Sequence, residues 1–294
     1  TMLVEPLAVI RVANELGEGI VWDERTQAFV WTDILARRLY RLPWGSDTPV
    51  VIDLPDRLGS FALTDDPDVI IAAFAPGFAR YRLSDGQCDW LARPALPHGV
   101  CFNDGRADRL GNFVAGTMVE NVAAAGGKDR GVLYRLEEDA SLSELVHGLH
   151  ISNSLCWSPD GRTMYHGDSP AQAITEYGYD ARGARYQRII SLFDDGYPDG
   201  ATVDAAGRIW VALWAAGCVA VLDPAGARLA TVPLGASQPT CTAFGGPDLD
   251  ILAVTSARTE LSDAALADQP DAGALFLFRA GARGLAEARA RAPR

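Results

Sequence analysis

The chain has 294 residues, a formal net charge of −12 and a sequence pI of about 4.7, so no basic surface is expected for nucleic acid or an anionic membrane. No apolar run approaches the ~18–20 residues of a membrane span, and the N-terminus lacks the features of a secretory signal. The five scattered cysteines include no CxxC pair, which argues against a disulfide framework and a zinc–thiolate site. We expect a cytoplasmic protein with no nucleic-acid, membrane or obligate protein partner.

The first predicted element is an isolated strand at residues 7–12, which has no hairpin partner nearby. From Glu18 onward the chain repeats one unit, in which a polar or small residue leads into an apolar strand, a tight turn and a second strand. The leading residue stands five positions before the turn, and successive copies begin 41 to 50 residues apart. The six copies begin at Glu18, Ser60, Asn103, Asn153, Asp199 and Thr240.

One or two weaker strands follow each hairpin, which gives the strand content and the length of a propeller blade. Third strands are predicted at residues 37–42, 78–83, 132–136, 174–179 and 218–222. Ankyrin and leucine-rich repeats are shorter and need regular helices that the pattern does not show. One repeated unit throughout favours a single domain over residues 1–294.

The last repeat has a hairpin over residues 240–256, a short helical piece near 261–267 and a third strand at 273–278, but no fourth strand. The isolated strand at 7–12 can supply the fourth strand and close the ring, which removes exposed sheet edges. The sequence therefore predicts an all-β fold, a six-bladed β-propeller with four strands per blade. The tail from residue 281 is expected to be a frayed helix or disordered, and no role is assigned to it.

The innermost strands of a propeller run the same way along the channel, so the first residues of the six repeats should meet at one end. Four of them are Glu18, Asn103, Asn153 and Asp199, which carry carboxylate or carboxamide groups. Asn103 and Asp199 also have a simpler interpretation as turn residues near glycine. Together, however, buried oxygen donors would be costly without a cation among them. One divalent ion is expected; the donors suit Ca²⁺, Mg²⁺ or Mn²⁺, and Zn²⁺ and Fe²⁺ also accept carboxylates.

Five motifs, in this order, make the chain resemble the regucalcin and gluconolactonase family of sugar lactonases. They are LGEG (16–19), FNDGRADRLGNFVAGTM (102–118), SNSLCWSPDGRTMYHGDS (152–169), YPDGATVDAAGRIWVALW (197–214) and FGGPDLDILAVTSAR (244–258). The resemblance implies a six-bladed propeller that hydrolyses sugar lactones at one divalent metal. It also implies three metal ligands, Glu18, Asn153 and Asp199, with Asn103 facing the substrate.

Two positions depart from the family pattern. Many members have an arginine two residues before the asparagine of the NDG motif, where this chain has Cys101, and the asparagine–glycine pair at the metal is here Asn153 followed by Ser154. Neither change removes an implied ligand. The loss of a cationic contact at Cys101 leaves the choice of sugar open among gluconolactone, galactonolactone and pentonolactones.

The implied reaction is metal-assisted lactone hydrolysis, with Asp199 as the candidate general base. Asn103, Cys101 and Glu120 are the candidate substrate-binding residues. A serine hydrolase is not indicated, because the sequence contains no GxSxG motif. Of the histidines, His166 is expected to be packed, and His98 and His150 are candidates for the pocket edge.

Three other functions compete with this one. One is a calcium-binding propeller without catalysis, and another is a phosphotriesterase-like hydrolase, because the same kind of metal can activate a phosphoryl centre. A metal-free propeller of the strictosidine synthase type is disfavoured by Glu18, Asn153 and Asp199. A small-molecule sugar lactone is the expected partner.

Overall fold

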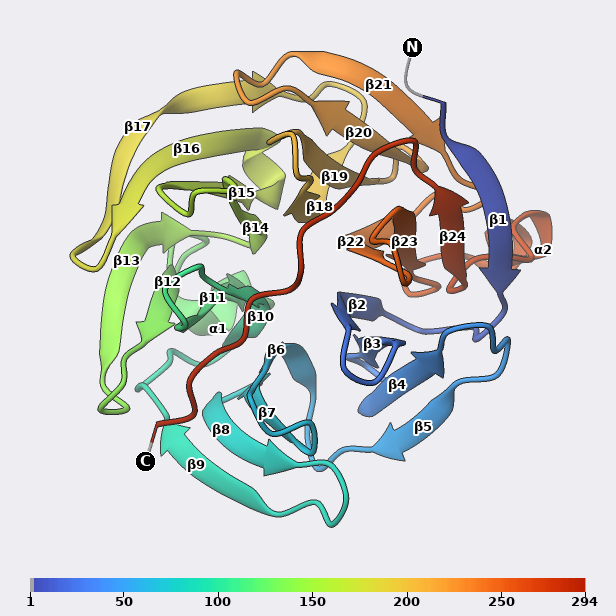
Figure 1. Cartoon of the computed structure of the whole chain (residues 1–294). Coiled ribbons are helices and arrows are strands. Elements are labelled where there is room, and N and C mark those ends of the chain that lie inside the picture. The colour runs from blue at the N-terminus through green and yellow to red at the C-terminus, as the bar shows by residue number, and fades with distance from the viewer. Residues whose placement is uncertain (1–2, 294) are drawn as a thin grey trace.

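Four-stranded antiparallel sheets make up nearly all the regular structure of the computed structural model, which describes residues 3–293. Six such sheets follow one another around a common centre, as Figure 1 shows. In five sheets the chain begins at the innermost strand and moves outward, and in the sixth the N-terminal strand β1 is the outermost one. The predicted six-bladed propeller with four strands per blade is confirmed.

The first three blades lie in chain order. Blade 1 contains β2 (Gly17–Asp23), β3 (Ala28–Asp33), β4 (Arg38–Pro43) and β5 (Val50–Asp53). Blade 2 contains β6 (Leu58–Leu63), β7 (Val69–Phe74), β8 (Gly77–Arg82) and β9 (Cys88–Ala92). Blade 3 contains β10 (Val100–Ala107), β11 (Phe113–Val119), β12 (Gly131–Leu136) and β13 (Leu142–Leu149), with the short helix α1 (Val122–Ala125) between β11 and β12.

The remaining blades complete the circle. Blade 4 contains β14 (Ser152–Trp157), β15 (Thr163–Asp168), β16 (Ala173–Asp180) and β17 (Gly183–Leu192), with a 3₁₀ turn at Ser169–Ala171. Blade 5 contains β18 (Tyr197–Val203), β19 (Ile209–Trp214), β20 (Cys218–Leu222) and β21 (Arg228–Pro233). Blade 6 contains β22 (Pro239–Gly245), β23 (Ile251–Ser256), β24 (Leu275–Arg279) and the N-terminal β1 (Glu5–Ile10), with α2 (Asp263–Asp268) between β23 and β24.

The predicted closure by the N-terminal strand is confirmed. Strand β1 pairs antiparallel with β24, from Glu5 opposite Arg279 to Ile10 opposite Leu275. The strand starts two residues earlier than the pattern indicated and ends at Ile10, where the backbone N–H of Val12 turns back to donate to the Ile10 carbonyl at 3.1 Å. The circle of blades is thereby closed by hydrogen bonds between an N-terminal and a C-terminal strand, and β1 is the outermost strand of blade 6.

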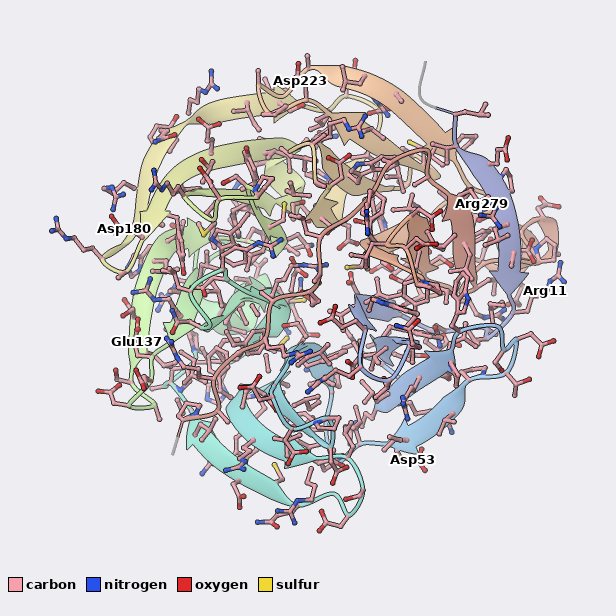
Figure 2. The ribbon with its side chains drawn as sticks, in the orientation of Figure 1. Arg11, Asp53, Glu137, Asp180, Asp223 and Arg279 are labelled. Carbon is pink, nitrogen blue, oxygen red and sulfur yellow. The ribbon has the colours of Figure 1, made fainter. Side chains whose placement is uncertain are left out.

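Burial explains why the inner strands read as continuous apolar runs. All residues of β2, β3, β6 and β7 are buried, because both faces of an inner strand pack against neighbouring blades. Outer strands such as β5 and β9 are largely exposed. Figure 2 shows charged side chains, including Asp53, Asp180 and Asp223, around the periphery of the disc. Within the described residues, no helix has both the length and the apolar character required to cross a membrane.

The tail after β24 is ordered and has no helix up to residue 293, so neither expectation for it is met. It crosses in front of the centre of the propeller in Figure 1. Its backbone joins the ends of several inner strands, with Ala290 N–H donating to the Leu63 carbonyl at 2.8 Å and Arg291 N–H donating to Gly111 at 2.9 Å. These partners follow inner strands β6 and β10, so the tail covers the end of the channel where the inner strands finish.

Candidate metal centre and substrate cavity

The six residues that begin the repeats are all buried and form a ring at one end of the channel, called the ring here. Every inner strand has a register shift at or beside its ring residue. Such bulges redirect side chains and are frequent beside binding sites. The local irregularity explains how side chains from six regular sheets converge. The ring consists of Glu18, Ser60, Asn103, Asn153, Asp199 and Thr240.

Two ring residues hold neighbouring blades together. Ser60 Oγ donates to the Asn103 carbonyl at 2.7 Å, and Thr240 Oγ1 donates to the Gly17 carbonyl. The Thr240 hydroxyl also lies 2.8 Å from Thr255 Oγ1. Both hydroxyls therefore have partners within the protein, which separates them from the four carboxyl and carboxamide side chains of the ring.

The two asparagines of the ring are fixed through their amide nitrogens. Asn103 Nδ2 donates to the Ser152 carbonyl at 3.0 Å, and Asn153 Nδ2 donates to Ser169 Oγ at 2.8 Å. Ser169 Oγ in turn donates to the Pro198 carbonyl at 2.7 Å, beside Asp199. With each nitrogen committed to the protein, the amide oxygen is the atom left to face a ligand.

Two oxygens of the ring are buried without a hydrogen-bond partner. They are Oδ1 of Asn153 and Oδ1 of Asp199. A buried acceptor without a partner costs free energy comparable to a lost hydrogen bond, so two such oxygens in one ring of oxygen donors are compatible with a bound cation. Glu18 adds a carboxylate whose Oε2 accepts a bond from Gly19 N–H at 3.0 Å.

Simultaneous ionisation of the two ring carboxyl groups, Glu18 and Asp199, is strongly disfavoured. Burial is the largest cause that raises the pKa of Glu18 well above its ordinary value, followed by the charge of Asp199. Burial also raises the pKa of Asp199. Two buried carboxyls in contact can both ionise only if positive charge lies beside them. Carboxylate and amide oxygens with free lone pairs are the donors that divalent cations prefer, so these residues fit a divalent ion.

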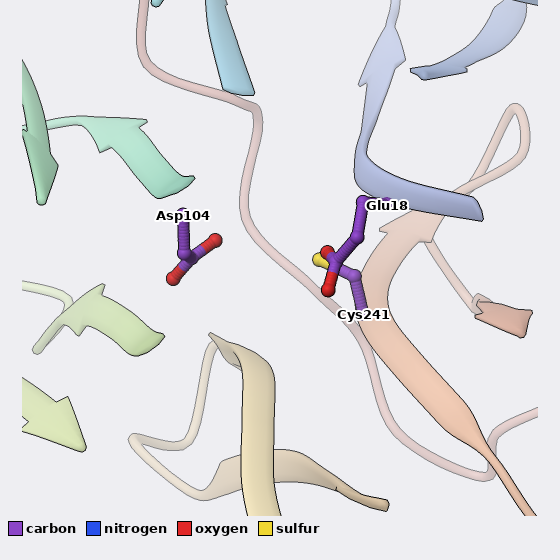
Figure 3. Close-up of side chains that lie close together, drawn as sticks. All are labelled: Glu18, Asp104 and Cys241. Carbon is purple, nitrogen blue, oxygen red and sulfur yellow. The ribbon is translucent and has the colours of Figure 1, made fainter. Parts of the chain in front are cut away.

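Asp104 and Cys241 join this centre, although the sequence did not single them out. One ligand atom of each, together with one of Glu18, lies within 4.8 Å of the others, and Figure 3 shows the three side chains directed into the same space from different strands. Asp104 Oδ2 accepts a bond from Leu155 N–H at 3.1 Å, and burial raises the pKa of its carboxyl to about 6. Burial raises the pKa of Cys241 to about 12, which keeps that thiol neutral.

The sequence held a signal for Asp104. Neighbouring residues of a regular strand point to opposite faces, but the register of β10 shifts between Phe102 and Gly105. As a result Asn103 and Asp104 both bond to β14, through Ser152 and Leu155. An Asn-Asp-Gly motif at a bulge could therefore have predicted two inward polar residues instead of one.

A cavity of about 670 Å³ is lined mainly by residues of blades 2 and 3 and by the segments next to them, and no ring residue lines it. Its lining includes the predicted substrate residues Cys101 and Glu120, and also His98. Cys101 precedes Asn103 by two positions on β10, a separation of about 7 Å along a strand. The cavity therefore lies beside the oxygen cluster. Burial raises the pKa of Cys101 to about 12, so its thiol is not ionised at neutral pH.

Arg57 also lines this cavity, and no pattern in the sequence pointed to it. Its guanidinium donates two hydrogen bonds to Glu120, at 2.5 Å from Nη1 to Oε1 and at 3.1 Å from Nη2 to Oε2. The two residues belong to different blades and are 63 positions apart, so no local spacing connects them.

Neither His166, which was expected to be packed, nor His150, a candidate for the pocket edge, lines the cavity. His166 is buried, with its Nε2 atom 2.7 Å from Ser152 Oγ, and burial lowers its pKa to about 4. This agrees with the expectation of a packed residue. His150 is held through its backbone N–H, which donates to Asp168 Oδ2 at 3.0 Å. Of the three, only His98 is placed at the cavity edge.

The opposite end of the channel is closed by the tail. Arg106 Nη1 lies 2.8 Å from Glu287 Oε2, and its Nη2 donates to the Thr242 carbonyl at 3.1 Å. The side chains of Arg106 and Glu287 are 10% and 15% exposed. Only a space of about 30 Å³ remains there, lined by Arg106, Cys156 and residues 285–288 of the tail among others. The tail and this ion pair cover that end of the channel.

The fold agrees with comparison to known proteins. Residues 16–258 match the family described as SMP-30/Gluconolactonase/LRE-like region, and the chain belongs to this family. The resemblance to the regucalcin and gluconolactonase group is thereby confirmed, and the chain is a member of a sugar lactonase family.

Two relatives and one solved structure are similar to the chain over nearly its whole length. The chain is 39% identical over 285 residues to an L-arabinolactonase of Azospirillum brasilense, which covers 94% of this chain and 92% of that protein. It is 34% identical over 290 residues to a 6-deoxy-6-sulfogluconolactonase of Pseudomonas putida, covering 95% and 96%. A solved structure of a calcium-binding protein, regucalcin, from Agrobacterium tumefaciens superimposes with a TM-score of 0.90 at 29% identity and 98% coverage of both chains.

Proposed function

We propose that this protein hydrolyses a sugar lactone to its aldonic acid, using one divalent ion held by Glu18, Asn153 and Asp199. The observation that carries the proposal is the pair of buried oxygens without partners, Asn153 Oδ1 and Asp199 Oδ1, at the point where the inner strands converge. The similarity to enzymes named as sugar lactonases supports the reaction class.

The residues divide the chemistry between them. When bound, a divalent ion would stabilise the negative charge that develops on the lactone carbonyl oxygen. Asp199 would accept a proton from the attacking water, because its carboxylate is one of the two that would lie beside the ion. Asn103, held by the Ser152 carbonyl, would orient the lactone through its amide oxygen.

The cavity beside the ring would receive the hydroxylated part of the substrate. Glu120 is one-third exposed there and offers acceptor oxygens, whereas Cys101 is buried and neutral and would contact the substrate without attacking it. The test begins with L-arabinonolactone and includes gluconolactone and galactonolactone. The five cysteines are all free and lie within the described residues, which is compatible with the cytoplasmic location we propose.

The experiment is a turnover assay on this lactone panel together with an organophosphate triester. The protein is stripped with a chelator and then reloaded separately with Ca²⁺, Mg²⁺, Mn²⁺, Zn²⁺ or Fe²⁺. We expect lactone hydrolysis that disappears with the chelator and returns with one equivalent of metal. Full activity in the presence of chelator would contradict the metal mechanism.

Two outcomes correspond to the other functions. One equivalent of bound metal with no turnover of any lactone or triester would indicate a calcium-binding propeller, the kind of protein that the Agrobacterium regucalcin is described to be. Faster hydrolysis of the triester than of every lactone would indicate a phosphotriesterase.

A further inference from the structure

We propose that Arg57 is a specificity-determining residue that binds neighbouring hydroxyl groups of the sugar lactone together with Glu120, which favours substrates with an uncharged polyhydroxylated end. This inference rests on the proposed lactone hydrolysis for its substrate class.

Arg57 is anchored at the ring end of blade 2. It lies directly before β6, its carbonyl accepts a bond from Ala75 N–H at 2.9 Å, and its N–H donates to Asp56 Oδ1 at 2.7 Å. From there its side chain reaches Glu120, which follows β11 in blade 3. The backbone of Glu120 is fixed in turn, because its N–H donates to the Gly99 carbonyl at 2.8 Å. The pair therefore spans the cavity wall between two rigid blades.

Arg57 and Glu120 retain hydrogen-bond donors and acceptors that are available to a ligand. A guanidinium has five N–H donors, and Arg57 uses two of them on Glu120. The hydrogen bonds from Arg57 lower the pKa of Glu120, so the carboxylate is ionised and each oxygen retains a lone pair. With 29% of the Arg57 side chain and 35% of the Glu120 side chain exposed, donors and acceptors face the cavity side by side. Two neighbouring hydroxyls, each both donor and acceptor, match this arrangement.

The charge around the cavity points to an uncharged group. Its lining contains two arginines, Arg37 and Arg57, and two acidic residues, Asp56 and Glu120. Formal charges cancel if His98 is neutral. An anionic substituent would therefore gain little from Arg57, whose charge is already paired, whereas a polyol loses no ionic hydration on entry.

Cys101 leaves room for this interaction. Its thiol is close enough to Arg57 and Glu120 for both side chains to affect its pKa, and it is buried at the base of the cavity. A thiol at this point is neutral and small, so its contact with Arg57 and Glu120 adds no charge to the pair and fills little of the space beside it.

The test compares wild-type protein with Arg57→Ala and Arg57→Lys, all loaded with the same divalent metal. Kinetics are measured on L-arabinonolactone and on γ-butyrolactone, which has the ring but no hydroxyls. Binding of 1,4-anhydroarabinitol, a cyclic polyol that cannot be hydrolysed, is measured by calorimetry. Arg82→Ala is the matched control, because Arg82 is also in blade 2 and pairs with a carboxylate, Asp85, at 3.1 Å, but does not line the cavity.

For Arg57→Ala we expect KM for arabinonolactone and Kd for the anhydroalditol to rise about tenfold or more, equivalent to about 1.4 kcal/mol. Metal content, kcat and the kinetics on γ-butyrolactone should change little, Arg57→Lys should recover part of the loss, and Arg82→Ala should match wild type. Equal losses on both lactones, or no loss on either, would overturn the inference.

The design separates this inference from the proposed function. If wild type hydrolyses no lactone but binds the anhydroalditol and Arg57→Ala weakens that binding, polyol recognition by Arg57 stands and lactonase activity fails. If wild type hydrolyses arabinonolactone and Arg57→Ala leaves KM and Kd unchanged, lactonase activity stands and the role of Arg57 fails. A selective loss on the sulfonated lactone 6-deoxy-6-sulfogluconolactone would replace the polyol assignment with an anionic one.

Discussion

The two ends of the central channel differ in whether their buried charged groups have partners within the protein. At the ring end, Asp199 and Asn153 have oxygens without partners, and Glu18 adds a second buried carboxyl. At the other end, Arg106 is paired with Glu287 of the tail and bonded to the Thr242 carbonyl. At the ring end the unpartnered groups include a carboxylate, whereas at the other end the buried guanidinium is paired.

This contrast indicates where a ligand belongs. A fold that satisfies a buried guanidinium with a partner 181 residues away is able to satisfy buried charge where no ligand is needed. Leaving two carboxyls in contact at the ring is then a local cost that is removed when a cation binds. The following predictions test the two ends separately.

The largest effect is expected at the ring. Asp199→Asn keeps the volume of the side chain but removes a charge and the proposed base, so kcat/KM for the best lactone should fall on the order of 1,000-fold. Metal analysis should show less than one equivalent bound. Asp195→Asn, an exposed substitution in the segment preceding β18, is the control and should retain activity. A full equivalent of metal with normal turnover in Asp199→Asn would refute the assigned site.

The next effect concerns the closed end and stability. Glu287→Ala leaves Arg106 buried without its carboxylate, which should lower the free energy of unfolding by about 2–3 kcal/mol. Denaturant unfolding of the metal-loaded protein measures this change. Glu24→Ala removes an exposed ion pair with Arg289 of the same tail and should cost less than about 0.5 kcal/mol. Equal effects of the two variants would mean that the buried pair does not secure the tail.

A third prediction uses pH to compare the metal-free and metal-loaded ring. The pKa values of Glu18 and Asp199 are raised in the folded state, mainly by burial, so the folded protein holds more protons than the unfolded chain. The contribution of these two carboxyl groups to the stability of metal-free protein should therefore be greatest below about pH 4. It should decrease as pH rises toward about 7.

Melting temperatures measured in chelator across this pH range provide the test. Added metal should remove the decrease at neutral pH by binding the ionised form, and Glu18→Gln should flatten the metal-free profile. A metal-free protein whose melting temperature rises between pH 5 and 7 by an amount that Glu18→Gln does not alter would show that the carboxyl pair is not strained.

The smallest effect concerns the backbone of the ring. Ser154 has φ of 56°, a left-handed conformation that favours glycine, and its Oγ donates to the Asp199 carbonyl. Ser154→Ala keeps the strain and loses the hydrogen bond, which should cost about 1 kcal/mol. Ser154→Gly loses the same bond but relieves the conformation, so it should be less destabilising than Ser154→Ala in thermal unfolding. The reverse order would show that the strain is unimportant.

Local sequence was sufficient to determine the repeat and the position of the ring. Each blade begins with a hairpin whose turn residues and apolar strands lie within about 20 residues of one another, and the 41 to 50 residue spacing specifies the blade. Closure could also be predicted, because the last repeat lacked one strand and residues 7–12 had no partner. Bulge geometry decided that Asp104 would join Asn103 in facing β14, and a pattern based on regular alternation missed it.

Only the tertiary structure decided what surrounds the ring. Arg57 meets Glu120 across two blades, and Glu287 reaches Arg106 from a tail to which the sequence assigned no role. No characteristic sequence separation predicts either pair, because each contact depends on how two blades, or a blade and the tail, pack against each other. The propeller repeat specifies its inner strands because their burial imposes a periodic apolar pattern, whereas loops and tails that cover the two ends are constrained by charge and shape, which leave no period in the sequence.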